Sequence, residues 1–213
     1  KTFDWLIMNT EPVQNNNILI VDIDENFINE YGGWPLPRTA YADLITTTSA
    51  IPGITVLMPN PDIRDTRNDD ILALRMNYIP TVLASAASTQ VTGINPHVGT
   101  AQLGEDPLPW LFEYPGILPT TSTLESKAKG LGLVTATPEI DGVTRRVPLV
   151  VNVQSKLYPS FALELLRVAI GDPSYQIKTE EQGLAWVRVP SYPLMNTDAN
   201  GRIYLNWNTK FYK

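Results

Sequence analysis

Two aspartates at the end of an apolar run are the first residues whose types and spacing could support chemistry. The run Ile18 to Asp24 reads ILIVDID, so Asp22 and Asp24 lie two positions apart. Four branched apolar residues in succession predict a strand buried on both faces, and residues two apart in a strand share a face. Such a carboxylate pair could bind Mg²⁺ or another ligand. In the structural alternative, one carboxylate caps the next turn and the other pairs with Arg38.

The same pair supports an enzymatic hypothesis, a Mg²⁺-dependent phosphohydrolase that uses Asp22 and Asp24. A D-x-D pair after a buried strand resembles the phosphotransferases of the haloacid dehalogenase group. That group has Thr or Val two residues after the second Asp, where this chain has Asn26, and its downstream Lys and acidic pair are not evident. The phosphohydrolase is therefore the second hypothesis.

The segment WPLPR, from Trp34 to Arg38, could clamp a ligand. Its two prolines restrict the backbone, Trp34 offers a large apolar face, and Arg38 offers a guanidinium fork for carboxylate or phosphate. Alternatively, the segment is a rigid corner that buries Trp34 and satisfies Arg38 internally. We expect Asp24 and Arg38 to be mainly a structural pair, with ligand contact as the alternative.

Other polar residues give weaker signals for a metal or a catalytic group. Asp62, Asp65, Asp69 and Asp70 follow one another closely without the glycine that a calcium loop needs, which favours a solvated loop leading into a helix. His97 is the only histidine, so a site with two or three histidines is excluded. We expect no catalytic residue, no metal ligand and no cofactor.

The elements that must position these residues predict an α/β domain. Strand, helix, strand, helix and strand in succession form a parallel βαβαβ unit with right-handed crossovers. The carboxyl ends of its strands would bring Asp24, Trp34, Arg38 and the loop at 59–65 to one edge. The expected strands are 18–24, 54–58 and 81–84, and the expected helices are 38–50 and 68–76.

The second half of the chain predicts mostly antiparallel strands. Residues 85–119 are rich in Gly and Pro and should contain short strands or a loop. The fold expected is therefore a single domain, 1–213, with a mixed central sheet whose first half is parallel and whose C-terminal strands are antiparallel. The other expected elements are helices at 121–129 and 159–170, strands at 131–135, 143–153, 185–189, 194–195 and 201–207, and a hairpin turn at 138–142.

Composition excludes several classes of function. The 213 residues carry a net charge of −6, and no basic cluster exceeds Arg145–Arg146, which argues against a nucleic-acid binder. The chain has no cysteine, so disulfides and thiolate metal sites are excluded. No apolar run approaches the roughly 20 residues of a membrane span. Both ends look cut from a longer protein.

The order of several short segments resembles a CHASE domain of the second type, a sensory domain associated with cyclases and histidine kinases. The segments that carry the resemblance are IVDIDE at 20–25, GWPLPR at 33–38, YADLI at 41–45, DDILA at 69–73, GLV at 132–134, PEIDGVTRR at 138–146, YPSFALE at 158–164 and IYLNW at 203–207. The chain departs from the family where Glu139 replaces the first Asp of D-x-D-G-V-x-R, and where residues 56–60 lack an Asp.

The resemblance implies a sensor rather than an enzyme. Its expected place is the periplasmic or extracellular side of a cell inner membrane, with flanking transmembrane helices and a cytoplasmic output such as an adenylate or diguanylate cyclase or a histidine kinase. The partners expected are a small-molecule or protein signal, the membrane through those helices, and a second copy of the chain. A dimerisation module without a small ligand is a third hypothesis. The ligand-binding candidates are Asp24, Trp34, Arg38, Asp62 and Arg145.

Overall fold

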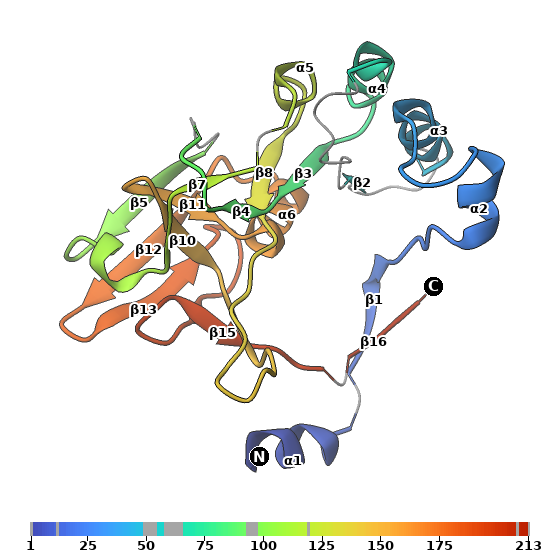
Figure 1. Ribbon diagram of the computed structural model, residues 1–213. Helices are drawn as coiled ribbons and strands as arrows, with labels where there is room; N and C mark the ends of the chain where they lie inside the picture. The colour runs from blue at the N-terminus through green and yellow to red at the C-terminus, as the bar shows by residue number, and fades with distance from the viewer. Residues whose placement is uncertain are drawn as a thin grey trace.

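The structure of this chain, a computed structural model, describes residues 2–11, 13–48, 55–57, 66–92, 98–118, 120–207 and 209–212. Within these residues the fold is mixed α/β, as the sequence predicts, with both parallel and antiparallel strand pairs (Figure 1). The helices are α1 (Thr2–Met8), α2 (Glu25–Glu30), α3 (Arg38–Thr48), α4 (Asp69–Arg75), the short 3-10 helix η1 (Leu108–Trp110), α5 (Ser122–Glu125) and α6 (Phe161–Ile170).

The described strands form several small sheets rather than one continuous central sheet. One four-stranded sheet has the order β14-β13-β12-β5, and a three-stranded sheet has the order β11-β10-β6. The strands are β1 (Val13–Leu19), β2 (Thr55–Leu57), β3 (Thr81–Ser85), β4 (Ala87–Ser88), β5 (Gly99–Leu103), β6 (Glu113–Tyr114), β7 (Gly116–Ile117), β8 (Gly130–Leu133), β9 (Arg146–Pro148), β10 (Val150–Val153), β11 (Lys156–Pro159), β12 (Ser174–Glu180), β13 (Gly183–Arg188), β14 (Met195–Asn196), β15 (Arg202–Tyr204) and β16 (Thr209–Tyr212).

A parallel sheet with the order β2-β3-β8 forms the centre of the first half. Figure 1 shows α3, α4 and α5 on one side of this sheet and α6 on the other. Strands β2 and β3 coincide closely with the strands expected at 54–58 and 81–84, and helices α3 and α4 with the helices expected at 38–50 and 68–76. The parallel half is therefore confirmed for β2 and β3, with β8 as the third strand.

The expected first strand, 18–24, is wrong. β1 begins at Val13, before the expected start of the strand, and ends at Leu19. β1 pairs in parallel with β16, from the other end of the chain, and not with β2. Ile18, Leu19, Ile20 and Val21 are each 43–52% exposed, so the run is not buried on either face. A local apolar pattern cannot specify a pairing partner from the opposite end of the chain.

The second half confirms the helix expected at 159–170 as α6 and the antiparallel pairing of β10 with β11 and of β12 with β13, whereas β12 also pairs in parallel with β5. α6 is capped by Ser160 at its N-terminus and by Gly171 at its C-terminus, where a φ of 81° lies in the left-handed region that favours glycine. The expected return strand 143–153 is divided between β9 and β10. β12, which pairs with β13 and β5, was not predicted at all.

Two apolar clusters form the core. The first lies between α3, α4 and the β2-β3-β8 sheet and includes the fully buried Ile45 and Leu83. The second surrounds β12, β13 and α6, with Tyr175 and Val187 at its centre. No helix among the described residues is long and apolar enough to cross a membrane.

Candidate functional site

Asp24, the first ligand-binding candidate, caps a helix. Its carboxylate accepts a hydrogen bond of 2.9 Å from the backbone N–H of Phe27, and Asp24 is the residue before the first turn of α2. This is the standard arrangement at a helix N-terminus, where backbone N–H groups lack intrahelical partners. The expected cap therefore exists, but Arg38 is not the partner of Asp24.

Arg38 forms a buried ion pair with Asp69. Its Nε lies 2.7 Å from Asp69 Oδ1, and each side chain is 5% exposed. Arg38 is the first residue of α3 and Asp69 the first residue of α4, so the pair joins the N-terminal ends of the two helices. The expectation that Arg38 is satisfied inside the protein is confirmed, with a partner that lies 31 residues away.

Trp34 lies on the surface with 64% of its area exposed. The alternative in which the WPLPR corner buries this ring is therefore wrong, whereas Leu36 of the same segment is buried. Asp62 lies outside the described residues. Among the described residues, no group of three or more His, Cys, Asp and Glu side chains is placed to hold a metal ion. Ligand contact by Asp24, Trp34 or Arg38 remains a prediction.

Arg145 lies at the centre of a cluster of carboxylates, which we call the Arg145 cluster and define as Arg145, Asp4, Glu139 and Asp141. Nε and Nη2 of Arg145 donate to the two oxygens of Asp4 at 2.5 and 2.7 Å. Nη1 and Nη2 donate to the two oxygens of Asp141 at 2.9 and 2.7 Å, and Nη1 also donates to Glu139 at 3.2 Å. The five N–H groups of a guanidinium are thus all engaged by carboxylates.

These charges change the pKa values of the cluster. The hydrogen bonds from Arg145 lower the pKa of Asp4 to about 2 and that of Asp141 to about 2. The same bonds, to Asp4 first and to Asp141 second, raise the pKa of Arg145 further above its ordinary range. All three groups are charged at neutral pH, and the side chain of Arg145 is only 8% exposed.

The cluster continues into the C-terminal segment. Arg146 donates to Glu139 at 2.8 Å and to Asp198 at 3.0 Å, and Asp198 also accepts from Arg202 on β15. The Arg146 guanidinium lies over the ring of Tyr204, 5.5 Å from its centroid. Backbone bonds reinforce this contact, because Leu205 N–H donates to the Arg145 carbonyl at 2.8 Å and β9 pairs with β15.

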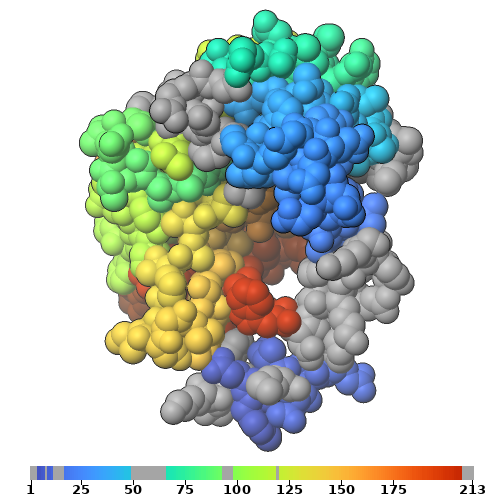
Figure 2. Space-filling model, turned by 45° about the vertical axis from the view of Figure 1, so that its right-hand side comes forward, coloured from blue at the N-terminus to red at the C-terminus, as the bar shows by residue number. Residues whose placement is uncertain are grey.

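The result is a junction of three segments that are distant in the sequence. Helix α1 supplies Asp4, the turn at 139–142 supplies two carboxylates, and the C-terminal segment supplies Asp198 and Arg202. Figure 2 shows the blue α1 below the yellow residues of that turn, with the red C-terminal residues beside them. The sequence predicted a hairpin turn at 138–142. The turn is present, but the hairpin is wrong, because the flanking strands β8 and β9 pair with β3 and β15 and not with each other. The sequence also singled out the Arg145–Arg146 pair. It contained no signal for Asp4 as a partner.

The YPSFALE segment has a separate, structural function. Glu164 is fully buried, and its carboxylate accepts from Nε and Nη2 of Arg167 at 2.9 and 2.7 Å. Arg167 also donates to the carbonyls of Lys129 and Asp172. A Cβ on Gly130 would lie 2.2 Å from Glu164 Oε1, and one on Gly132 would lie 2.4 Å from the Cα of Phe161. The two glycines of β8 therefore allow α6 to pack closely against this strand.

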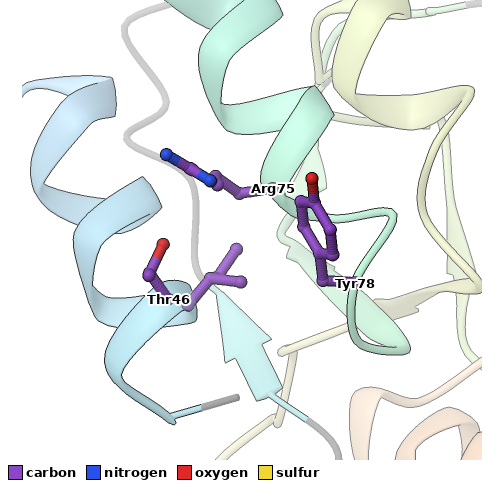
Figure 3. Close-up of a pocket in the computed structure, with 4 residues that line it drawn as sticks. Thr46, Arg75 and Tyr78 are labelled. Atoms are coloured by element: carbon purple, nitrogen blue, oxygen red, sulfur yellow. The ribbon is translucent and has the colours of Figure 1, made fainter.

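A pocket of about 480 Å³ opens between α3 and α4, lined by Ile45, Thr46, Arg75 and Tyr78. Figure 3 shows Arg75 extending from α4 toward α3, Thr46 across from it, and Tyr78 on the other side of Arg75. No pattern in the sequence indicates this pocket. The residues that line it form no recognisable sequence pattern, because they come to share a cavity only when the two helices pack side by side.

An arginine-carboxylate cluster thus joins an N-terminal helix to the C-terminal strands of this α/β domain. The family model of the CHASE2 domain matches residues 1–213, and the chain belongs to this family. CHASE2 domains are extracellular sensory domains found in signalling receptors. Neither the curated proteins nor the solved structures contain a match to the chain.

Proposed function

We propose that this chain is the non-catalytic, extracytoplasmic signal-sensing domain of a bacterial transmembrane receptor. The output would be a cytoplasmic adenylate or diguanylate cyclase or a histidine kinase. Attachment to the cell inner membrane would run through flanking transmembrane helices, as the family resemblance implies. The signal would be a small molecule or a protein, and a second copy of the chain is a further proposed partner.

The Arg145 cluster is the observation that carries this proposal. A sensor must transmit a conformational change in its folded domain to the segments that lead toward the membrane. Asp4 belongs to α1, near the start of the chain, and the Arg146–Asp198–Arg202 bonds lie shortly before the end of the chain. One turn, 139–142, contacts both through Arg145 and Arg146. A shift of this turn would therefore displace the bonding partners of both terminal segments.

The mechanism requires two arrangements of the domain with different affinities for the signal. A ligand shifts an equilibrium only by the difference between its affinities for the two states. In one arrangement Arg145 holds Asp4 as described. In the other, we propose, α1 is released from Arg145, while Asp141 and Glu139 keep the guanidinium neutralised. The coupling free energy between signal and output then resides partly in the Asp4–Arg145 pair.

The experiment is an output assay on the full-length receptor with Asp4→Asn. This change removes the charge of Asp4 and leaves the residue size almost unaltered, so the basal output should shift and its dependence on the signal should weaken. Asp70→Asn is the matched control, because Asp70 likewise lies in the first turn of a helix and is exposed. The proposal fails if both variants keep the basal output and signal response of the wild-type receptor.

A further inference from the structure

The pocket between α3 and α4 contains a cationic group that the rest of the described structure does not use. Within the part of the chain that the structure describes, the guanidinium of Arg75 has no hydrogen-bond or ion-pair partner, and neither has the hydroxyl of Tyr78. The arginines at positions 38, 145, 146, 167 and 202 are each paired with a carboxylate. Arg75 is therefore the cation available to a ligand in this pocket.

We infer that this pocket binds a small organic carboxylate with an apolar body. A guanidinium binds a carboxylate through two parallel N–H···O bonds. The ring of Tyr78, which is 67% exposed, provides apolar surface beside these donors, whereas Ile45 lines the pocket as a fully buried core residue. The volume of about 480 Å³ lies within the range of small-molecule sites, roughly 300–1,000 Å³.

A purely structural explanation for Arg75 competes with this inference. Arg75 is in the last turn of α4, where a positive charge compensates the negative end of the helix dipole. That explanation requires the charge alone and gives no reason for a cavity beside it. It also predicts that Arg75→Gln changes stability slightly and binding not at all, so binding measurements separate the two.

The role of this pocket as a signal site rests on the proposed sensor function. Its position between α3 and α4 connects the two. The Arg38–Asp69 pair joins α3 and α4 at their N-terminal ends. Thr46 and Arg75 lie near the opposite, C-terminal ends of the same helices. A carboxylate held by Arg75 would therefore change the separation of two helices whose other ends are tied together.

The binding experiment uses this chain with benzoate, 3-phenylpropanoate and 4-methylpentanoate, each paired with its neutral amide, and follows binding by NMR titration. At least one carboxylate should bind at concentrations below about 10 mM, and its amide should bind about tenfold or more weakly. Arg75→Gln should weaken the binding of that carboxylate by about tenfold to a hundredfold. Arg75→Lys, which keeps the charge and loses the fork, should give an intermediate loss.

Arg188→Gln is the control, because Arg188 is exposed on β13, away from the pocket. It should bind the carboxylate like the wild type, and circular dichroism should show that every variant keeps its helix content. The inference is overturned if no carboxylate of the set binds, if amides bind equally well, or if Arg75→Gln leaves binding unchanged. Such a failure would not affect the Asp4→Asn test of the receptor, which does not involve this pocket.

Discussion

Arg145 and Asp4 are 141 residues apart in the sequence, and two hydrogen bonds of 2.5 and 2.7 Å join the guanidinium of one to both carboxylate oxygens of the other. This pair attaches the N-terminal helix to the turn that precedes β9. Because Asp141 and Glu139 occupy the remaining donors of Arg145, the attachment belongs to a saturated cluster and is not an isolated surface contact.

Replacement of Arg145 should loosen α1 and destabilise the protein more than replacement of Asp4. Arg145→Lys keeps the charge, but a single ammonium nitrogen cannot serve three carboxylates in the geometry of a fork. The backbone amides of α1 should then exchange with deuterium faster, while those of β12 and β13 should be unaffected. Arg188→Lys is the matched control. Unchanged exchange in α1 would show that the Asp4–Arg145 pair does not hold this helix.

The stability of the protein should fall as the pH is lowered from about 4 to about 2. Asp4 and Asp141 have an ordinary pKa of 3.8 in the unfolded chain and a pKa of about 2 in the native protein. Within this window the unfolded state binds more protons, so acid favours unfolding, and the contribution is fully present only above pH 3.8. Urea denaturation at several pH values measures the slope. Asp4→Asn and Asp141→Asn should each flatten it, and an unaltered slope in both would contradict this account.

Gly130→Ala should destabilise the protein because it forces the buried Glu164–Arg167 pair to move. The added Cβ would lie 2.2 Å from Glu164 Oε1, closer than any contact that a packed interior allows. Overpacking of this kind costs about 1–3 kcal/mol in the free energy of unfolding. Gly99→Ala, also at the start of a strand, has no atom within 4 Å of the new Cβ and should change it by less than about 0.5 kcal/mol. Denaturation curves of both variants give the comparison, and equal values would refute the packing argument.

The two ends of the WPLPR segment should respond differently to substitution. Arg38→Met leaves the carboxylate of Asp69 buried without its cation, which costs about 3–5 kcal/mol in the free energy of unfolding. Trp34→Ala removes a ring that is 64% exposed and should change this free energy by less than about 0.5 kcal/mol. Trp34→Ala is therefore the substitution in this segment that can test signalling without a loss of stability. A severe loss of stability in Trp34→Ala would contradict this division.

The sequence predicted local structure well where one segment contains the whole signal. The helices at α3, α4 and α6 and the strands β2, β3 and β13 follow from periodicity and from their flanking Gly, Pro and Ser residues. The family resemblance followed from short segments in a fixed order. The prediction for residues 18–24 failed, because an apolar run indicates a strand but does not determine which strand pairs with it. β12 was missed although Tyr175, Ile177 and Thr179 alternate with polar residues and are buried, which is the two-residue period of a half-buried strand.

Long-range partners were decided by the tertiary structure alone. The sequence by itself indicated an α/β domain of a sensory family and a turn at Asp141–Gly142, and it left internal satisfaction of Arg38 as one of two alternatives. Only the fold decided that Arg38 pairs with Asp69 and that Arg145 binds Asp4. It also decided that Arg75 faces a pocket and has no partner among the residues that the structure describes. The physical reason is that ion pairs and cavities depend on distances between segments far apart in the chain, and neither residue type nor local periodicity contains those distances.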